Sequence, residues 1–64
     1  MILEIGDTVK ITAQGTTRTG VINSVSNYGS DEQPDFYIEL TSTQHGAVYW
    51  KQSIDGGTVE KVAA

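Results

Sequence analysis

Four side chains on two neighbouring predicted strands offer the chemistry best suited to binding in this sequence. They are two tyrosines, one glutamate and one lysine, Tyr37, Glu39, Tyr49 and Lys51. Tyrosine rings provide a large apolar contact area that ends in a polar hydroxyl, and they are enriched at protein interfaces. We therefore predict a partner-binding surface at these residues. The partner would be another protein or a second copy of the chain.

Residues suited to catalysis or to metal binding are sparse. The chain has no cysteine, and its one histidine, His45, stands in a predicted turn beside Gly46. No serine belongs to a nucleophile motif, and no glycine-rich phosphate loop or paired set of metal ligands is present. We predict no catalytic residue, no cofactor and no metal site, and therefore a protein that is not an enzyme.

An acidic stretch, Asp31-Glu32-Gln33-Pro34-Asp35, could in principle offer carboxylates to calcium. It lacks the alternating Asp or Asn ligands and the closing Glu of a calcium-binding loop. We interpret residues 27–35 as a long solvated loop. A role in docking a basic partner stays open.

The charge of the chain bears on its partners. Its 64 residues include eight acidic and four basic side chains, which give a net charge of −4. Phosphate backbones repel such a chain unless its cations cluster, and Lys10, Arg18, Lys51 and Lys61 are scattered. The charge therefore argues against nucleic-acid binding, which stays the alternative function. Clustering of Lys10, Arg18 and Lys51 on one face would favour it.

Length and hydropathy suggest one small domain over residues 1–64. No stretch reaches the roughly 20 apolar residues of a membrane span, and the acidic start does not resemble a signal peptide. We therefore expect a cytoplasmic protein without membrane contact. A domain of this size without disulfides or metals is often stabilised by oligomerisation, so a homodimer and a monomer both stay open.

Alternating apolar and polar residues predict an all-β fold of five antiparallel strands. In the first strand Val9 and Ile11 point inward, and in the second a bulge at Asn23-Ser24 brings Ile22 and Val25 to one face. Residues 2–5 form a lead-in that we expect to pair with the far end of the chain. The predicted strands cover residues 8–13, 18–28, 36–41, 47–52 and 58–62.

The third and fourth strands alternate so that their large apolar residues face the core. Phe36, Ile38 and Leu40 point inward on one strand, as Val48 and Trp50 do on the other. The register we predict has four cross-strand pairs, which are Phe36 with Trp50, Ile38 with Val48, Tyr37 with Tyr49, and Asp35 with Lys51. Such pairs contribute roughly 0.2–1 kcal/mol each. Asp55-Gly56-Gly57 predicts the next turn.

Residues 6–25 carry a resemblance at the level of the fold. The order Gly6-Asp7-x-Val9-x-Ile11, a turn, then Gly20-Val21-Ile22-x-x-Val25 is similar to the opening of SH3-like barrels of the KOW and ribosomal-protein type. This resemblance implies a five-stranded, strongly bent antiparallel barrel. Such barrels often bind nucleic acid, but the fold hosts many functions.

The run Phe36-Tyr37-Ile38-Glu39-Leu40, followed by His45-Gly46-Ala47-Val48-Tyr49, is faintly similar to the type II dihydrofolate reductases, which build one active pore from four SH3-like chains. Their pore is lined by a Val-Gln-Ile-Tyr run, where this chain has Val48-Tyr49-Trp50-Lys51. Only Val48 matches, so the residues of that activity do not carry over. What the similarity does imply is that a short barrel can oligomerise.

The charge analysis predicts weak or no binding to generic duplex DNA at physiological salt, because the chain has a net charge of −4 and no basic run. A fluorescence anisotropy titration measures this directly. A salt-sensitive affinity below the micromolar range would contradict the prediction.

Overall fold

The structure is a computed structural model that describes residues 2–62. Its five strands are β1 (Thr8–Ala13), β2 (Thr16–Asn27), β3 (Phe36–Ser42), β4 (Gly46–Lys51) and β5 (Thr58–Lys61), with one short helix, α1 (Gln52–Asp55). All strand pairs are antiparallel, and the sheet has the order β4-β3-β2-β1-β5. The predicted all-β class with five strands is confirmed.

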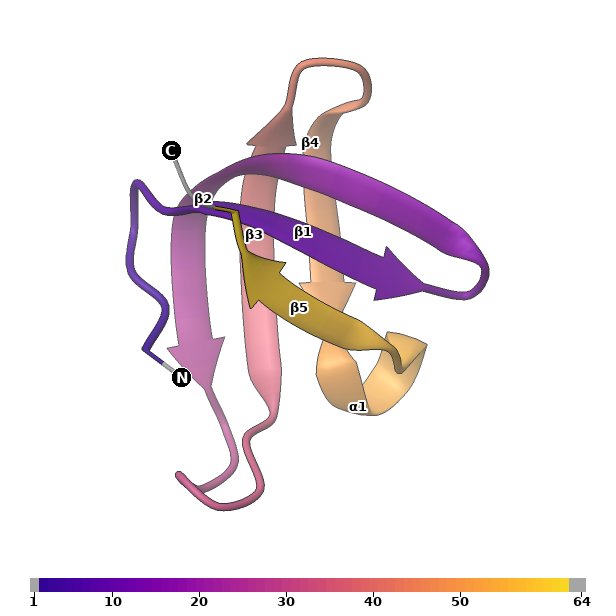
Figure 1. Ribbon diagram of the computed structural model, residues 1–64. Coiled ribbons are helices and arrows are strands. Elements are labelled where there is room, and N and C mark those ends of the chain that lie inside the picture. The colour runs from indigo at the N-terminus through magenta and orange to yellow at the C-terminus, as the bar shows by residue number, and fades with distance from the viewer. Residues whose placement is uncertain (1, 63–64) are drawn as a thin grey trace.

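Strand β2 is long enough to belong to two differently oriented parts of the sheet. Its first half pairs with β1, and its second half pairs with β3. Figure 1 shows β1, β5 and the first half of β2 crossing the direction of β3 and β4. The sheet is strongly bent as predicted, but it is not closed into a barrel, because β4 and β5 are its two edges and do not pair with each other.

The bend contains the predicted bulge. Pairing between β2 and β3 shifts between Ile22 and Ser24, so Ile22 is buried and Val25 packs against the same core. The extra residue, Asn23, turns its amide outward and donates a hydrogen bond to the Thr41 hydroxyl. An inserted residue breaks the two-residue alternation, and this is why both aliphatic side chains reach one face.

The core lies between the two parts of the bent sheet. Every strand contributes to it. The inward residues predicted for β1, β3 and β4 are buried except Val48, which is only partly buried. Trp50 is held in one orientation because its indole N–H donates to the Gly56 carbonyl over 2.8 Å. The buried apolar side chains are Leu3, Val9, Ile11, Ile22, Phe36, Ile38, Leu40, Trp50 and Val59.

Two local expectations are wrong. Helix α1 was not expected, since a single turn offers no periodicity to detect. Residues 2–5 form no strand with the described end of the chain. The Gly6-Asp7 segment that follows them bonds instead to β2, from the Gly6 N–H to the Ile22 carbonyl and from the Ile22 N–H to the Asp7 carbonyl, both over 2.9 Å. Near the end of the described chain, Lys61 forms an ion pair with Asp7 of that segment.

Gly20 of β2 lies tightly against the backbone of β3. A Cβ atom at this position would overlap the Thr41 carbonyl oxygen, which belongs to the backbone and cannot rotate away. We expect Gly20→Ala to lower the free energy of unfolding by about 3 kcal/mol, since overpacking of a tight site costs about 1–3 kcal/mol or more. Urea denaturation followed by Trp50 fluorescence measures it.

The matched control is Thr19→Ala, at an exposed position one residue earlier on the same strand. It should cost about 0.5 kcal/mol, as surface substitutions usually do. Equal losses for the two variants would show that the close approach of β2 and β3 does not constrain the bend.

Candidate functional site

The outer surface of β2, β3 and β4 brings the four predicted contact residues together. It carries Tyr28, Tyr37, Glu39, Tyr49 and Lys51, and we call it the tyrosine face. Tyr37 and Tyr49 are 40% and 61% exposed, which confirms that both rings lie outside the core. Tyr28, from the loop after β2, is 67% exposed and was not among the predicted contact residues.

The register of β3 and β4 differs from the predicted one by two residues. Tyr37 lies opposite Lys51, and Glu39 lies opposite Tyr49. The prediction that Tyr37 and Tyr49 face each other directly, as well as the Phe36–Trp50 and Ile38–Val48 pairs, is therefore wrong. A two-residue shift keeps every side chain on its predicted face, so the two tyrosines still share one surface as diagonal neighbours.

The turn between the two strands explains this register. Ser42 is buried, and its hydroxyl accepts hydrogen bonds from the backbone N–H groups of Gln44 and His45 at 3.2 and 3.3 Å. Gly46 follows with a φ of 69°, a conformation that glycine adopts without strain. These interactions make Ser42 and Gly46 the pair that closes the hairpin.

Lys51 is held within the tyrosine face and is not free. Its ammonium lies 2.6 Å from Asp35 Oδ2, 3.1 Å from the Ser53 hydroxyl and 5.1 Å from the centre of the Tyr28 ring. Asp35 and Lys51 thus form the predicted ion pair although they are not directly opposite in the ladder. The pair ties the loop after β2 to the end of β4.

The tyrosine face encloses a hollow of about 250 Å³. Its walls are Tyr28 and Tyr37, whose ring centres are 6.5 Å apart, together with Tyr49 and Glu39. Ser24 and Ser26 of β2 complete its lining. Glu39 is half-buried there and forms no ion pair with any described basic residue. The hollow therefore combines aromatic walls with one unpaired carboxylate.

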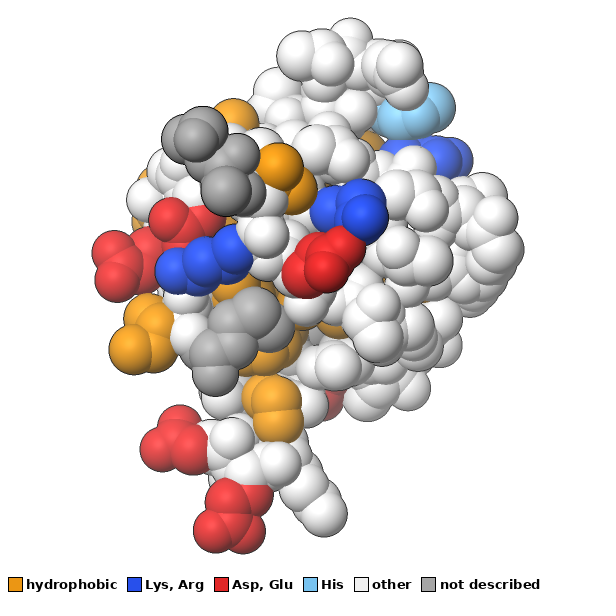
Figure 2. All heavy atoms as spheres, viewed as in Figure 1, with side chains coloured by type: hydrophobic (Ala, Val, Ile, Leu, Met, Phe, Trp, Pro, Cys, Tyr) orange, Lys and Arg blue, Asp and Glu red, His pale blue; other side chains and the backbone are white. Residues whose placement is uncertain are grey.

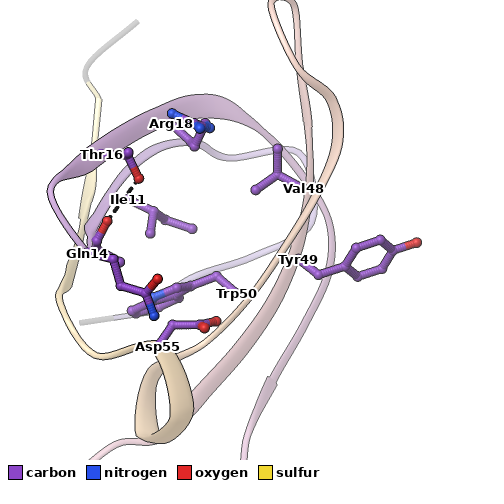
Figure 3. Close-up of a pocket in the computed structure, with 9 residues that line it drawn as sticks. Ile11, Gln14, Thr16, Arg18, Val48, Tyr49, Trp50 and Asp55 are labelled. Atoms are coloured by element: carbon purple, nitrogen blue, oxygen red, sulfur yellow. Dashed lines mark hydrogen bonds between the residues drawn. The ribbon is translucent and has the colours of Figure 1, made fainter.

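A second hollow of about 170 Å³ lies on the other side of β4, where the open sheet leaves a gap beside the β1–β2 hairpin. Figure 3 shows the side chains of Ile11, Val48 and Trp50 pointing toward this space, while Tyr49 points away from it. Ile11 and Trp50 in its lining are almost fully buried and belong to the core. We place the candidate site on the tyrosine face.

His45 and the acidic loop both lie on the surface. His45 is exposed in the β3–β4 turn, and the loop folds on itself, with the Asn27 side-chain oxygen accepting the N–H groups of Gly29 and Asp35. Within residues 2–62 no three His, Asp or Glu side chains gather where they could hold a metal ion.

No helix in that range is long and apolar enough to cross a bilayer.

Comparisons of the chain with family models, with curated proteins and with solved structures found no significant match.

The Asp35–Lys51 link predicts a dependence of stability on pH. The Lys51 ammonium, helped by Ser53, holds the pKa of Asp35 below its ordinary value of 3.8. A carboxyl with a lowered pKa stabilises the fold above its ordinary value, and this contribution is lost as the pH falls through the folded-state pKa. We expect the urea midpoint to fall below about pH 4.

Asp35→Asn should lower the midpoint at pH 7 and flatten its decline below about pH 4, since one acid-sensitive group is gone. Part of the decline in the urea midpoint should remain in this variant, because the pKa of Asp7 is also lowered, by the Glu4 N–H and by Lys61. Asp31→Asn is the control, because Asp31 is exposed and forms no ion pair with a described basic residue. An unchanged pH profile in Asp35→Asn would contradict the prediction.

Proposed function

We propose that this protein is a non-catalytic binding module or accessory subunit that contacts another protein, or a second copy of itself, through the tyrosine face. One observation carries the proposal. Three exposed tyrosines from β3, β4 and the β2–β3 loop lie around a common hollow, and Ile54 of α1, 75% exposed, extends the same surface beside Tyr37 and Tyr49.

The chemistry of this surface supports binding to protein. Tyrosine side chains contribute large contact area with few rotatable bonds, so little conformational entropy is lost when they are covered. Residues of this type dominate the binding energy of many interfaces. The three strands beneath hold the backbone of the face in place, which lowers the cost of ordering it on binding.

Nucleic-acid binding, the alternative predicted from the sequence, has less support. Each lysine is paired with a carboxylate, Lys10 with Glu60, Lys51 with Asp35 and Lys61 with Asp7. A cation that is already neutralised adds little to the attraction of a phosphate backbone. Among residues 2–62, Arg18 is the one basic side chain without a carboxylate partner, so a basic face has little support.

The wider setting of the protein is part of the same proposal. An SH3-like relationship is supported by the five antiparallel strands and by the bulge that bends β2, although the sheet is open. A cytoplasmic location is supported by the absence of cysteine, which suits a reducing compartment.

Self-association provides the first test. We expect the wild-type chain to associate weakly at tens to hundreds of micromolar and more strongly at high salt, because salt screens the repulsion between two copies of charge −4. Tyr49→Ala should shift the equilibrium toward monomer by about tenfold, as loss of a central aromatic contact does. Sedimentation equilibrium measures both effects.

Ile5→Ala is the matched control, since Ile5 is 71% exposed but lies in the lead-in outside the tyrosine face. It should leave association unchanged. Equal weakening by both substitutions would show that association does not use the tyrosine face. A wild-type chain that stays monomeric at every concentration would rule out the second copy as partner.

A further inference from the structure

We propose that the hollow of the tyrosine face receives a lysine or arginine side chain from a basic segment of a partner protein. This inference rests on the proposed function and adds the chemical class of the partner. It follows from three properties of the site, which are an unpaired carboxylate, aromatic walls that accept a cation, and a surplus of negative charge over the molecule.

The carboxylate is that of Glu39. Its neighbours across the strands are Tyr49 on β4 and Ser24 on β2, neither of which can neutralise it. Lys51, the cation of this face, is engaged by Asp35 at 2.6 Å. A half-buried carboxylate beside aromatic rings interacts more strongly with a cation than a fully solvated one does, because less water competes for it.

The tyrosine rings supply the second part of the site. Aromatic faces attract ammonium and guanidinium groups within about 6 Å of the ring centre. The face already contains one such contact, since Lys51 Nζ lies 5.1 Å from the centre of the Tyr28 ring. Tyr37 and Tyr49 flank Glu39 in the hollow and leave room for a second, incoming cation.

The charge balance of the whole molecule selects a basic partner over a second copy. Among residues 2–62, four acidic residues besides Glu39 form no ion pair. Arg18 is the one basic residue in that range that forms none. Figure 2 shows acidic side chains standing clear at the tip of the β2–β3 loop, and lysines lying beside acids elsewhere. Two identical copies repel each other, whereas a basic segment is attracted and steered to the surface.

The probe is a synthetic peptide, acetylated and amidated, of sequence Gly-Ser-Lys-Arg-Lys-Ser-Gly. It is titrated into the nitrogen-15-labelled protein and followed by the backbone amide signals in two-dimensional NMR. We expect saturable shifts centred on Tyr37, Glu39 and Tyr49, and weaker binding as salt rises from about 50 to 300 mM. The same peptide with Glu in place of its basic residues should produce no such shifts.

Two pairs of variants test the two parts of the site. Glu39→Gln keeps the size of the side chain and removes its charge, and it should weaken peptide binding about threefold to fivefold. The control, Glu4→Gln in the exposed lead-in, should weaken it less than about twofold. Tyr49→Phe keeps the ring and should retain the affinity, whereas Tyr49→Leu keeps only the bulk and should lose about threefold.

Two results would show that the attraction does not come from this hollow, and either would overturn the inference. One is equal binding of the basic and acidic peptides. The other is that Glu4→Gln weakens binding as much as Glu39→Gln. Absence of any peptide binding would overturn it as well. If Tyr49→Ala nevertheless dissociates self-associated protein, the tyrosine face still contacts protein and only its preference for a cation is refuted.

Discussion

The bulge in β2 is the constraint on which the rest of the structure depends. A chain of this length has one core, and both ends of β2 must contribute to it although they belong to differently oriented parts of the sheet. In a regular strand without the bulge, Ile22 and Val25 are three positions apart and would point to opposite faces. The same insertion puts Ser24 and Ser26 on the outside, where they line the hollow. The bend that completes the core therefore also shapes the candidate site.

The core and the tyrosine face are two sides of the same strands. On β3 and β4 each buried apolar residue alternates with a contact residue, so burying Ile38 and Trp50 necessarily presents Glu39 and Tyr49 outward. Lys51 adds a link of a different kind, since its ion pair with Asp35 fixes the loop that carries Tyr28. The outward position of Tyr37 and Tyr49 thus follows from burial of the alternate residues in the core, and that of Tyr28 from the Lys51–Asp35 ion pair.

The sequence predicts the faces of the strands better than it predicts their register. Alternation assigns each residue to a side, and a two-residue shift changes no assignment, so the hydrophobic pattern could not distinguish the observed pairs from the predicted ones. The register depends on the buried hydroxyl of Ser42 and on Gly46, which are visible in the sequence but carry no periodic signal. Tyr28 was not predicted as a contact residue because it lies where the predicted strand 18–28 meets the predicted loop 27–35, and alternation assigns no side at such a junction.

The two edges of the open sheet explain why its outer face is the better candidate for contact. Unpaired edges invite another strand, and proteins commonly block them with charge. At the end of β4 the Lys51 N–H is already taken by the Asp55 carboxylate over 3.2 Å, so α1 covers part of that edge. Strand β5 is short and carries Glu60 and Lys61, both exposed. Strand addition is therefore hindered at both edges, which supports the proposal that a partner contacts the tyrosine face instead of a sheet edge.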